Sequence, residues 1–151
     1  ILEGMQAGLS WSIILKKREN FKRAFDNFDY NICANYTDEY LESLRQDASI
    51  IRNKLKIYSV RKNAVAFLKV QKEFGSFDKY IWGFTDYKKI NNKLESYKDA
   101  ASESELSTRI SKDLKKRGFS FVGSTIIYSY MQAIGMINDH EKGCFCYKEC
   151  C

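Results

Sequence analysis

Apolar residues recur at three- and four-residue spacing along most of this chain, which is the spacing of a helix face that packs on a core. The pattern predicts helices over residues 11–25, 50–74, 77–84, 108–117 and 124–134, with further helical segments at 1–7 and from 37 onward. Four of these helices are preceded by residues that are expected to cap them: Ser10, Thr37, Ser49 and Ser107. Residues 26–36 and 86–105 are polar and weakly patterned, which predicts turns and a surface connection. The sequence therefore predicts an all-α fold.

Two glycines, Gly118 and Gly123, separate the last two predicted helices and indicate a tight turn between them. Such a corner aims unpaired backbone N–H groups, and the positive end of the second helix, at one point, which favours an anion such as a phosphate. Four basic residues come just before the turn: Lys112, Lys115, Lys116 and Arg117. The spacing fits a helix-hairpin-helix that grips a DNA backbone, and it also fits an ordinary helical hairpin with a solvated basic face.

Composition indicates a folded domain, because 44% of the 151 residues are hydrophobic and 15% are aromatic. The net charge of +6 fits a polyanionic partner, although solubility alone can also explain a basic protein. No run approaches the ~20 apolar residues of a membrane span and no secretory signal is visible, so we expect no membrane association. The chain starts at Ile1, inside a helical pattern, which indicates that natural N-terminal residues are missing.

The cysteines and the single histidine point to metal binding rather than to disulfides. The cysteines are odd in number and crowd at the C-terminus: Cys33, Cys144, Cys146, Cys150 and Cys151. Such a set fits a reducing cytoplasm better than a secreted disulfide framework. His140 precedes Cys144 by a spacing common in structural zinc sites, which need four ligands. The other tail cysteines could complete a local site or have no defined role.

A carboxylate and an indole, Glu3 and Trp11, lie close together near the start of the chain among mostly apolar neighbours. Burying an unpaired carboxylate is costly, so a buried Glu3 would need hydrogen-bond donors or a cationic ligand. Trp11 could form a stacking wall for a planar base. The plainer interpretation places Trp11 in the core and Glu3 on an exposed helix face.

Several stretches of the chain together resemble one known family. They are residues 2–11 with 15–20, 47–56, 114–119, 121–123, and 138–140 with Cys144. In this order and spacing they are similar to the bacterial 3-methyladenine DNA glycosylase I family, from residue 1 to about 147, whereas 86–107 match poorly. The resemblance implies an all-α, two-lobed helix-hairpin-helix DNA glycosylase fold, N-terminally truncated, in a single domain over residues 1–151. The hairpin would occupy about 107–135, and a zinc-binding tail would occupy 138–151.

The resemblance also implies a DNA repair enzyme. It would flip 3-methyladenine out of alkylated double-stranded DNA, hydrolyse its N-glycosidic bond and leave an abasic site, acting as a cytoplasmic monomer. The hairpin turn contains no lysine, which argues against a lyase step. The alternatives are a non-catalytic helix-hairpin-helix DNA-binding module and a small zinc-stabilised interaction domain. Glu3 and Trp11 favour the glycosylase, because a phosphate clamp needs neither.

The resemblance assigns site residues motif by motif. Glu3 is expected to be the catalytic group and to hydrogen-bond the flipped base, and Trp11 is expected to stack on that base. Gly8 and Leu9 lie on the loop expected to fill the gap in the duplex. Three residues are expected to present backbone N–H groups to a DNA phosphate: Val122, Gly123 and Ser124.

The remaining assignments concern the C-terminal tail. His140 and Cys144 resemble half of a structural zinc site, whose other two ligands, a Cys and a His, would lie upstream of Ile1. Asn138, rather than Asp139, is expected at the position where related enzymes hold a water-activating aspartate. We therefore expect selective binding and a labile substrate to supply most of the catalysis.

Overall fold

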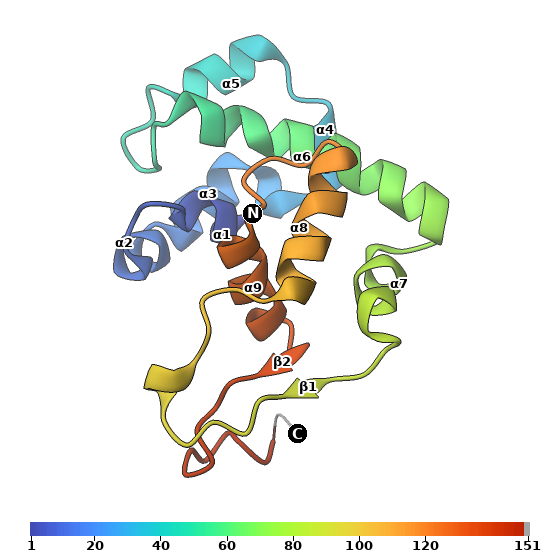
Figure 1. Ribbon diagram of the computed structural model, residues 1–151. Coiled ribbons are helices and arrows are strands. Elements are labelled where there is room, and N and C mark those ends of the chain that lie inside the picture. The colour runs from blue at the N-terminus through green and yellow to red at the C-terminus, as the bar shows by residue number, and fades with distance from the viewer. Residues whose placement is uncertain (150–151) are drawn as a thin grey trace.

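The computed structural model describes residues 1–149, and almost all of its regular structure is helical (Figure 1). The elements before the middle of the chain are α1 (Leu2–Gln6), α2 (Trp11–Lys16), α3 (Arg18–Ala24), η1 (Asp26–Phe28), α4 (Tyr30–Ala34), α5 (Asp38–Leu44) and α6 (Lys54–Phe74). The later elements are α7 (Phe77–Trp82), η2 (Gly83–Thr85), β1 (Ile90–Asn91), η3 (Tyr97–Asp99), α8 (Glu105–Lys116), α9 (Ser124–Ala133) and β2 (Ile137–Asn138). The predicted all-α class is confirmed. None of the helices described for residues 1–149 is long and apolar enough to cross a membrane.

Two hydrophobic cores divide the helices into two lobes. Met5, Phe21 and Val60 are buried in the first core, which gathers side chains from the N-terminal elements. Val70 and Ile110 are buried in the second core, which is built around the later helices. The long helix α6 contributes to both cores, and Figure 1 shows it crossing the molecule from α5 to α7. The predicted two-lobed arrangement is therefore present, with α6 as its connection.

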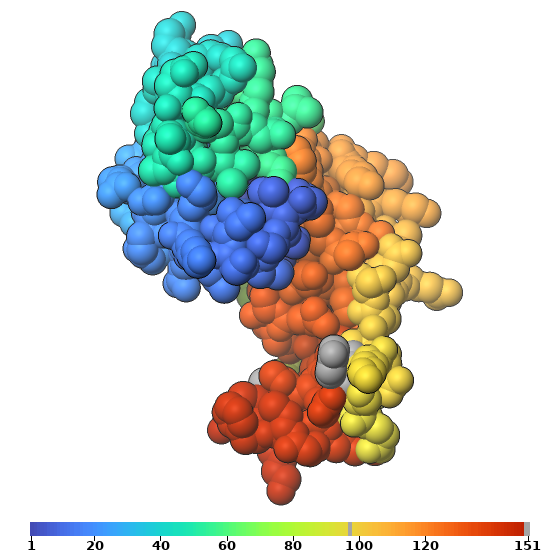
Figure 2. All heavy atoms as spheres, turned by 90° about the vertical axis from the view of Figure 1, so that its left-hand side faces the viewer, coloured from blue at the N-terminus to red at the C-terminus, as the bar shows by residue number. Residues whose placement is uncertain are grey.

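A short parallel strand pair joins two segments that lie far apart in the sequence. Ile90 of β1 pairs with Ile137 of β2, and the backbone N–H of Lys142 donates to the carbonyl of Leu94 at 3.0 Å. Figure 2 shows these segments side by side at the lower end of the molecule, the first in yellow and the C-terminal tail in red. The surface connection expected over 86–105 is thus partly a strand, because its backbone groups pair with the tail.

Two of the predicted N-caps are wrong, because the helices begin at other residues. The hydroxyl of Ser104 caps α8 by accepting the backbone N–H of Ser107 at 3.1 Å. Ser107 returns the contact, since its own oxygen accepts the N–H of Ser104, and the two residues form a capping box. Helix α6 is capped by the side chain of Asn53 rather than by Ser49.

The first lobe is more broken than its pattern predicted. Lys17 interrupts the helix expected over 11–25 and separates α2 from α3. Residues 26–36 contain η1 and α4, where only turns were expected. Thr37 caps α5 as predicted, whereas Ser10 stands at the N-cap of α2 without a side-chain capping bond. Local spacing therefore located most of the helices, but it missed α4 and the short break between α2 and α3.

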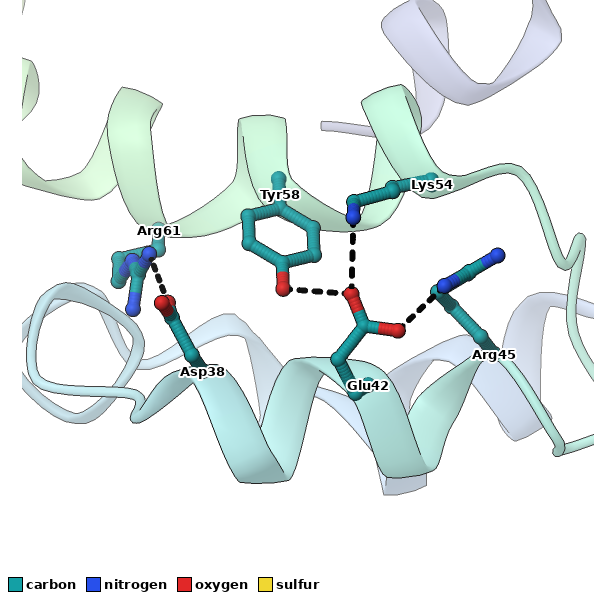
Figure 3. A network of polar contacts seen from close by, with 6 residues as sticks. All are labelled: Asp38, Glu42, Arg45, Lys54, Tyr58 and Arg61. Atoms are coloured by element: carbon teal, nitrogen blue, oxygen red, sulfur yellow. Dashed lines mark hydrogen bonds and ion pairs between the residues drawn. The ribbon is translucent and has the colours of Figure 1, made fainter.

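A polar network joins α5 to α6 on the surface of the first lobe (Figure 3). The Tyr58 hydroxyl donates to the Glu42 carboxylate at 2.7 Å, and the Lys54 ammonium lies 3.2 Å from the same oxygen. Arg45 binds the other carboxylate oxygen. These donors, the Tyr58 hydroxyl foremost, lower the pKa of Glu42 to about 2.

Glu42→Gln should lower the stability of the protein at neutral pH and have a smaller effect in acid. A carboxyl group whose pKa is lowered by folding, from an ordinary value of about 4.3, stabilises the native state at pH values above 4.3. That contribution disappears as the pH falls from about 4.3 toward about 2, because the folded chain then also binds the proton. Urea unfolding midpoints at pH 7 and pH 3 measure the effect. Glu19→Gln, which removes an exposed carboxylate, is the control, and a difference that stays constant between the two pH values contradicts the assignment.

Candidate functional site

A cavity of about 290 Å³ lies between the two cores, and its walls are mostly apolar. Aromatic rings from both lobes line it: Phe28, Tyr30, Phe67, Phe77, Phe119, Phe121 and Tyr130. Besides the tyrosine hydroxyls, the polar side chains on the wall are those of Glu3, Cys33, Ser59 and Asn63. An apolar cavity with aromatic walls and a few placed polar groups suits a planar, ring-shaped ligand.

Glu3 is the only carboxylate on the cavity wall among residues 1–149. It lies on α1, which packs so closely on the hairpin that a Cβ added at Gly4 would stand 3.1 Å from the Cβ of Phe121. The side chain is half-buried, and burial raises the pKa of its carboxyl group above the ordinary value. A charged carboxylate on an otherwise apolar wall favours a cationic ligand. The plainer interpretation, in which Glu3 is an exposed helix residue, does not hold.

Trp11 is not on this wall. The residue begins α2 and 37% of its surface is exposed, so it is neither core nor in contact with the cavity beside Glu3. The loop before it contains Gly8, which has a φ of 74°, and Leu9, whose carbonyl accepts a hydrogen bond from the Gln6 amide at 2.7 Å. Gly8 is exposed at the tip of the loop, whereas Leu9 is half-buried against the first core. The stacking role of Trp11 stays a prediction.

Lys56 holds the end of α1 in place. Its ammonium donates to the carbonyls of Met5 at 2.9 Å and Ala7 at 2.6 Å, and the side chain is almost entirely buried. Burial lowers the pKa of this ammonium, but a cation at the C-terminal end of a helix is stabilised by the helix dipole. Sequence reasoning missed this residue, because its partners lie 51 and 49 residues away.

Helices α8 and α9 form the predicted hairpin, and the turn between them is fixed at several points. Gly118 takes a φ of 96°, a left-handed conformation that glycine adopts at little cost. The Ser111 hydroxyl donates to the Val122 carbonyl at 2.5 Å, which ties the end of the turn to α8. From the other lobe, the Asn63 side chain binds the backbone of Ser120. Nothing in the local sequence around Asn63 indicated this contact.

The N-terminus of α9 is placed to receive an anion. Gly123 occupies the N-cap and has no side chain to accept the first N–H groups of the helix. The Ser124 hydroxyl donates to the Glu103 carboxylate, so an anionic acceptor already lies beside this helix end. Val122, Gly123 and Ser124 are thus brought together at the start of a ten-residue helix, where backbone N–H groups and the helix dipole favour negative charge.

In the C-terminal tail, the Cys144 sulfur lies 3.6 Å from Nδ1 of His140. Tetrahedral zinc, with Zn–S bonds of about 2.3 Å and Zn–N bonds of about 2.0–2.1 Å, places two such ligand atoms about 3.6 Å apart, so the pair fits one metal ion. Within residues 1–149, no group of three or more His, Cys, Asp or Glu side chains could hold a metal ion, and Cys146 does not complete a local site. Cys150 and Cys151 lie outside the described residues.

Comparison with known proteins places this architecture in a family. The sequence profile of the family described as methyladenine glycosylase matches residues 1–147. The chain belongs to this family. The chain is 44% identical over 146 residues to DNA-3-methyladenine glycosylase 1 of Escherichia coli (strain K12), and the match covers 97% of this chain and 78% of that protein.

Solved structures of 3-methyladenine DNA glycosylase I share the fold of this chain. One crystal structure is similar with a TM-score of 0.93 at 44% identity, covering 97% of this chain and 80% of the other. A crystal structure of a variant in complex with 3-methyladenine also gives a TM-score of 0.93, at 33% identity, covering 95% and 77% of the two chains. The all-α glycosylase fold implied by the family resemblance is therefore confirmed.

Asn138 and Asp139 do not line the cavity. Asn138 is buried, and its amide donates to the carbonyl of Tyr147 at 3.1 Å and accepts the N–H of His140 at 3.0 Å. The Asp139 carboxylate accepts the Tyr128 hydroxyl at 2.8 Å and two side-chain amides. Both side chains hold the tail in place, and neither faces the wall that carries the candidate site.

Proposed function

We propose that this chain is a monofunctional DNA-3-methyladenine glycosylase, which hydrolyses the N-glycosidic bond of 3-methyladenine in alkylated DNA and leaves an abasic site. The observation that carries the proposal is the lone carboxylate, Glu3, on the wall of an aromatic cavity beside the hairpin. The name of the 44% identical relative, and the neighbouring structure in complex with 3-methyladenine, support the choice of substrate.

The chemistry of the substrate explains why one carboxylate suffices. Alkylation at N3 makes the adenine cationic, which weakens the glycosidic bond and makes the base a good leaving group. The base, unstacked at a cost of about a few kcal/mol, would enter the aromatic cavity. Glu3 would accept hydrogen bonds from the edge of the base, and its negative charge would favour the cation over neutral adenine. Burial raises the pKa of the Glu3 carboxyl group, although the Ile1 ammonium acts in the opposite direction, and this raised pKa supports a role in binding a cationic ligand.

We infer that selective binding and the labile substrate supply most of the catalysis. Glu3 is the only carboxylate on the wall within the described part of the chain. Asp139, the nearest candidate for a water-activating group in the sequence, is instead tied to the tail. Residues 118–123 contain no lysine, so no Schiff-base lyase step is expected.

We infer that the α8–α9 pair acts as a helix-hairpin-helix on the DNA backbone. The N–H groups of Val122, Gly123 and Ser124 would bind a phosphate at the start of α9. The loop with the exposed Gly8 and the half-buried Leu9 would enter the gap that the flipped base leaves. Trp11, exposed at the end of this loop, would stack on the base as it leaves the duplex.

We also infer that His140 and Cys144 hold a structural zinc ion together with a Cys and a His from residues N-terminal to Ile1, as the family resemblance implies. The 3.6 Å separation of the two ligand atoms supports this assignment. Zinc bound there would tie the tail to the other end of the chain and contribute to folding, not to the chemistry of the base.

His140→Ala and Cys144→Ser should each reduce the zinc content of the full-length protein from about one ion per chain to a small fraction of that. Cys146→Ser is the matched control and should retain the wild-type content, because Cys146 does not complete a metal site with the pair. Metal analysis by mass spectrometry after dialysis measures the content. Equal zinc in wild type and His140→Ala would overturn the assignment.

The proposed function is tested by incubating the full-length protein with methylated duplex DNA and separating the released bases by chromatography. We expect free 3-methyladenine and an equal number of abasic sites, without strand cleavage. Binding of the DNA without release of base would overturn the proposal and support a non-catalytic DNA-binding module.

A further inference from the structure

The Asn63 side chain forms a two-point clamp across the two lobes. Asn63 lies in the middle of α6 and its amide oxygen accepts the backbone N–H of Ser120 at 2.8 Å. Its amide nitrogen donates to the carbonyl of the same residue at 3.0 Å. One side chain thus satisfies both backbone groups of a residue that lies 57 positions further along the chain and sits in the hairpin turn.

The turn needs such support because its backbone is strained. Phe121, directly after Ser120, has a φ of 57°, in the left-handed region that side chains other than glycine rarely adopt. Conformations of this kind persist only where the surroundings impose them. Side-chain hydrogen bonds hold the turn on both sides of Phe121: the Asn63 clamp binds Ser120, and the Ser111 hydroxyl binds the carbonyl of Val122.

The clamped turn carries parts of the site on both sides. The Phe121 ring lines the cavity, and the Cβ of Phe121 lies against α1 at Gly4, next to Glu3. The residues that follow Phe121 lead directly into the N-terminus of α9, where we place the DNA phosphate. Asn63 itself lines the cavity. A shift of the turn would therefore move the cavity wall beside Glu3 and the phosphate site together.

We propose that Asn63 is a positioning residue for base excision. By fixing the hairpin turn, it holds constant the distance between the cavity wall around the base and the N–H groups that bind the phosphate. The inference rests on the proposed glycosylase function and deepens it. Asn63 acts through Ser120 and Phe121 and takes no part in bond cleavage. Small displacements of a reacting group are costly in rate, which is why a remote clamp matters.

Asn63→Ala removes both hydrogen bonds and should slow single-turnover release of 3-methyladenine by roughly tenfold or more. Asn20→Ala is the matched control: the Asn20 amide also bridges distant segments, donating to the Ser49 carbonyl at 3.1 Å, but it does not line the cavity. Both variants are assayed at a temperature where circular dichroism shows them folded. A purely structural role predicts equal losses in the two variants, and that result would overturn the proposal, as would an Asn63→Ala variant with the wild-type rate.

Asn63→Asp supplies a readout that general destabilisation does not move. The ionised carboxylate can accept from Ser120 but has no donor for its carbonyl, whereas the protonated form has both an acceptor and a donor. The rate of Asn63→Asp, divided by the wild-type rate at each pH, should therefore rise as the pH falls from about 7 to about 4.5. A flat ratio would count against the clamp. If the wild-type protein releases no base, the proposed function is wrong. If the wild type is active and substitution of Asn63 leaves the rate unchanged, only this inference is wrong.

Discussion

Glu3→Gln is expected to slow the release of 3-methyladenine by roughly 10–150-fold. The substitution keeps the size of the side chain and removes its charge, so the loss measures the interaction between a carboxylate and a cationic base. A hydrogen bond to a charged group contributes about 1.5–3 kcal/mol, and about 1.4 kcal/mol corresponds to a factor of ten in rate. Single-turnover release from methylated duplex, with the protein in excess, is the appropriate measurement because it excludes product release.

The pH profile of the same reaction is a second test of Glu3. Burial raises the pKa of the carboxyl group, and only the ionised form attracts a cation. The wild-type rate should therefore fall as the pH decreases through this raised pKa, whereas Glu3→Gln should lack that decrease. A decrease of the same shape in both proteins would assign the titration to another group.

Loss of activity in Glu3→Gln should not be accompanied by loss of stability. A carboxyl group whose pKa is raised by folding destabilises the native state at pH values above that pKa, so the amide variant should be at least as stable as wild type at neutral pH. Glu19→Gln, on the exposed face of α3, should keep the wild-type rate. Equal rates in wild type and Glu3→Gln would remove Glu3 from the base pocket.

The parts of the fold that the sequence predicted well are those with local causes. The hairpin follows from helical spacing on both sides of Gly118, whose left-handed backbone is a property of one residue. The capping errors arose where two suitable residues compete, as Ser104 and Ser107 do at α8. The β1–β2 pairing was missed because two-residue strands carry no pattern of their own, and their partners are far apart in the sequence.

The residues of the candidate site also differ in whether the sequence alone could reveal them. Glu3 was assigned to the site through the family resemblance, because its residue type and neighbours alone also fit an exposed position on a helix. Lys56 and Asn63 could not be predicted, since a lysine or an asparagine on a long helix usually faces solvent, and their partners are set by the packing of the two lobes. For Trp11, the aromatic ring indicated a wall of the pocket. The structure instead leaves Trp11 exposed and outside the cavity lining, because its position depends on how α2 packs.

Lys56→Met should lower the free energy of unfolding by about 3 kcal/mol and also weaken base excision. Methionine matches the length of the lysine stem, but it leaves the carbonyls of Met5 and Ala7 without their charged donor. Helix α1 has five residues, far below the roughly 12–15 at which an isolated helix becomes marginally stable, so it depends on such contacts. Urea unfolding gives the stability, and the single-turnover assay gives the rate.

Lys54→Met separates this effect from the general loss of a positive charge at the start of α6. The Lys54 ammonium lies 3.2 Å from Glu42 on the surface, and such exposed pairs contribute about 0–1 kcal/mol. Its loss should leave excision unchanged, because the Lys54 ammonium pairs with Glu42 of α5, whereas Lys56 binds the carbonyls at the end of α1. If Lys56→Met matched Lys54→Met in both assays, water would be replacing the ammonium at the α1 carbonyls. Glu3 would then owe its position to the packing of α1 on Phe121 alone.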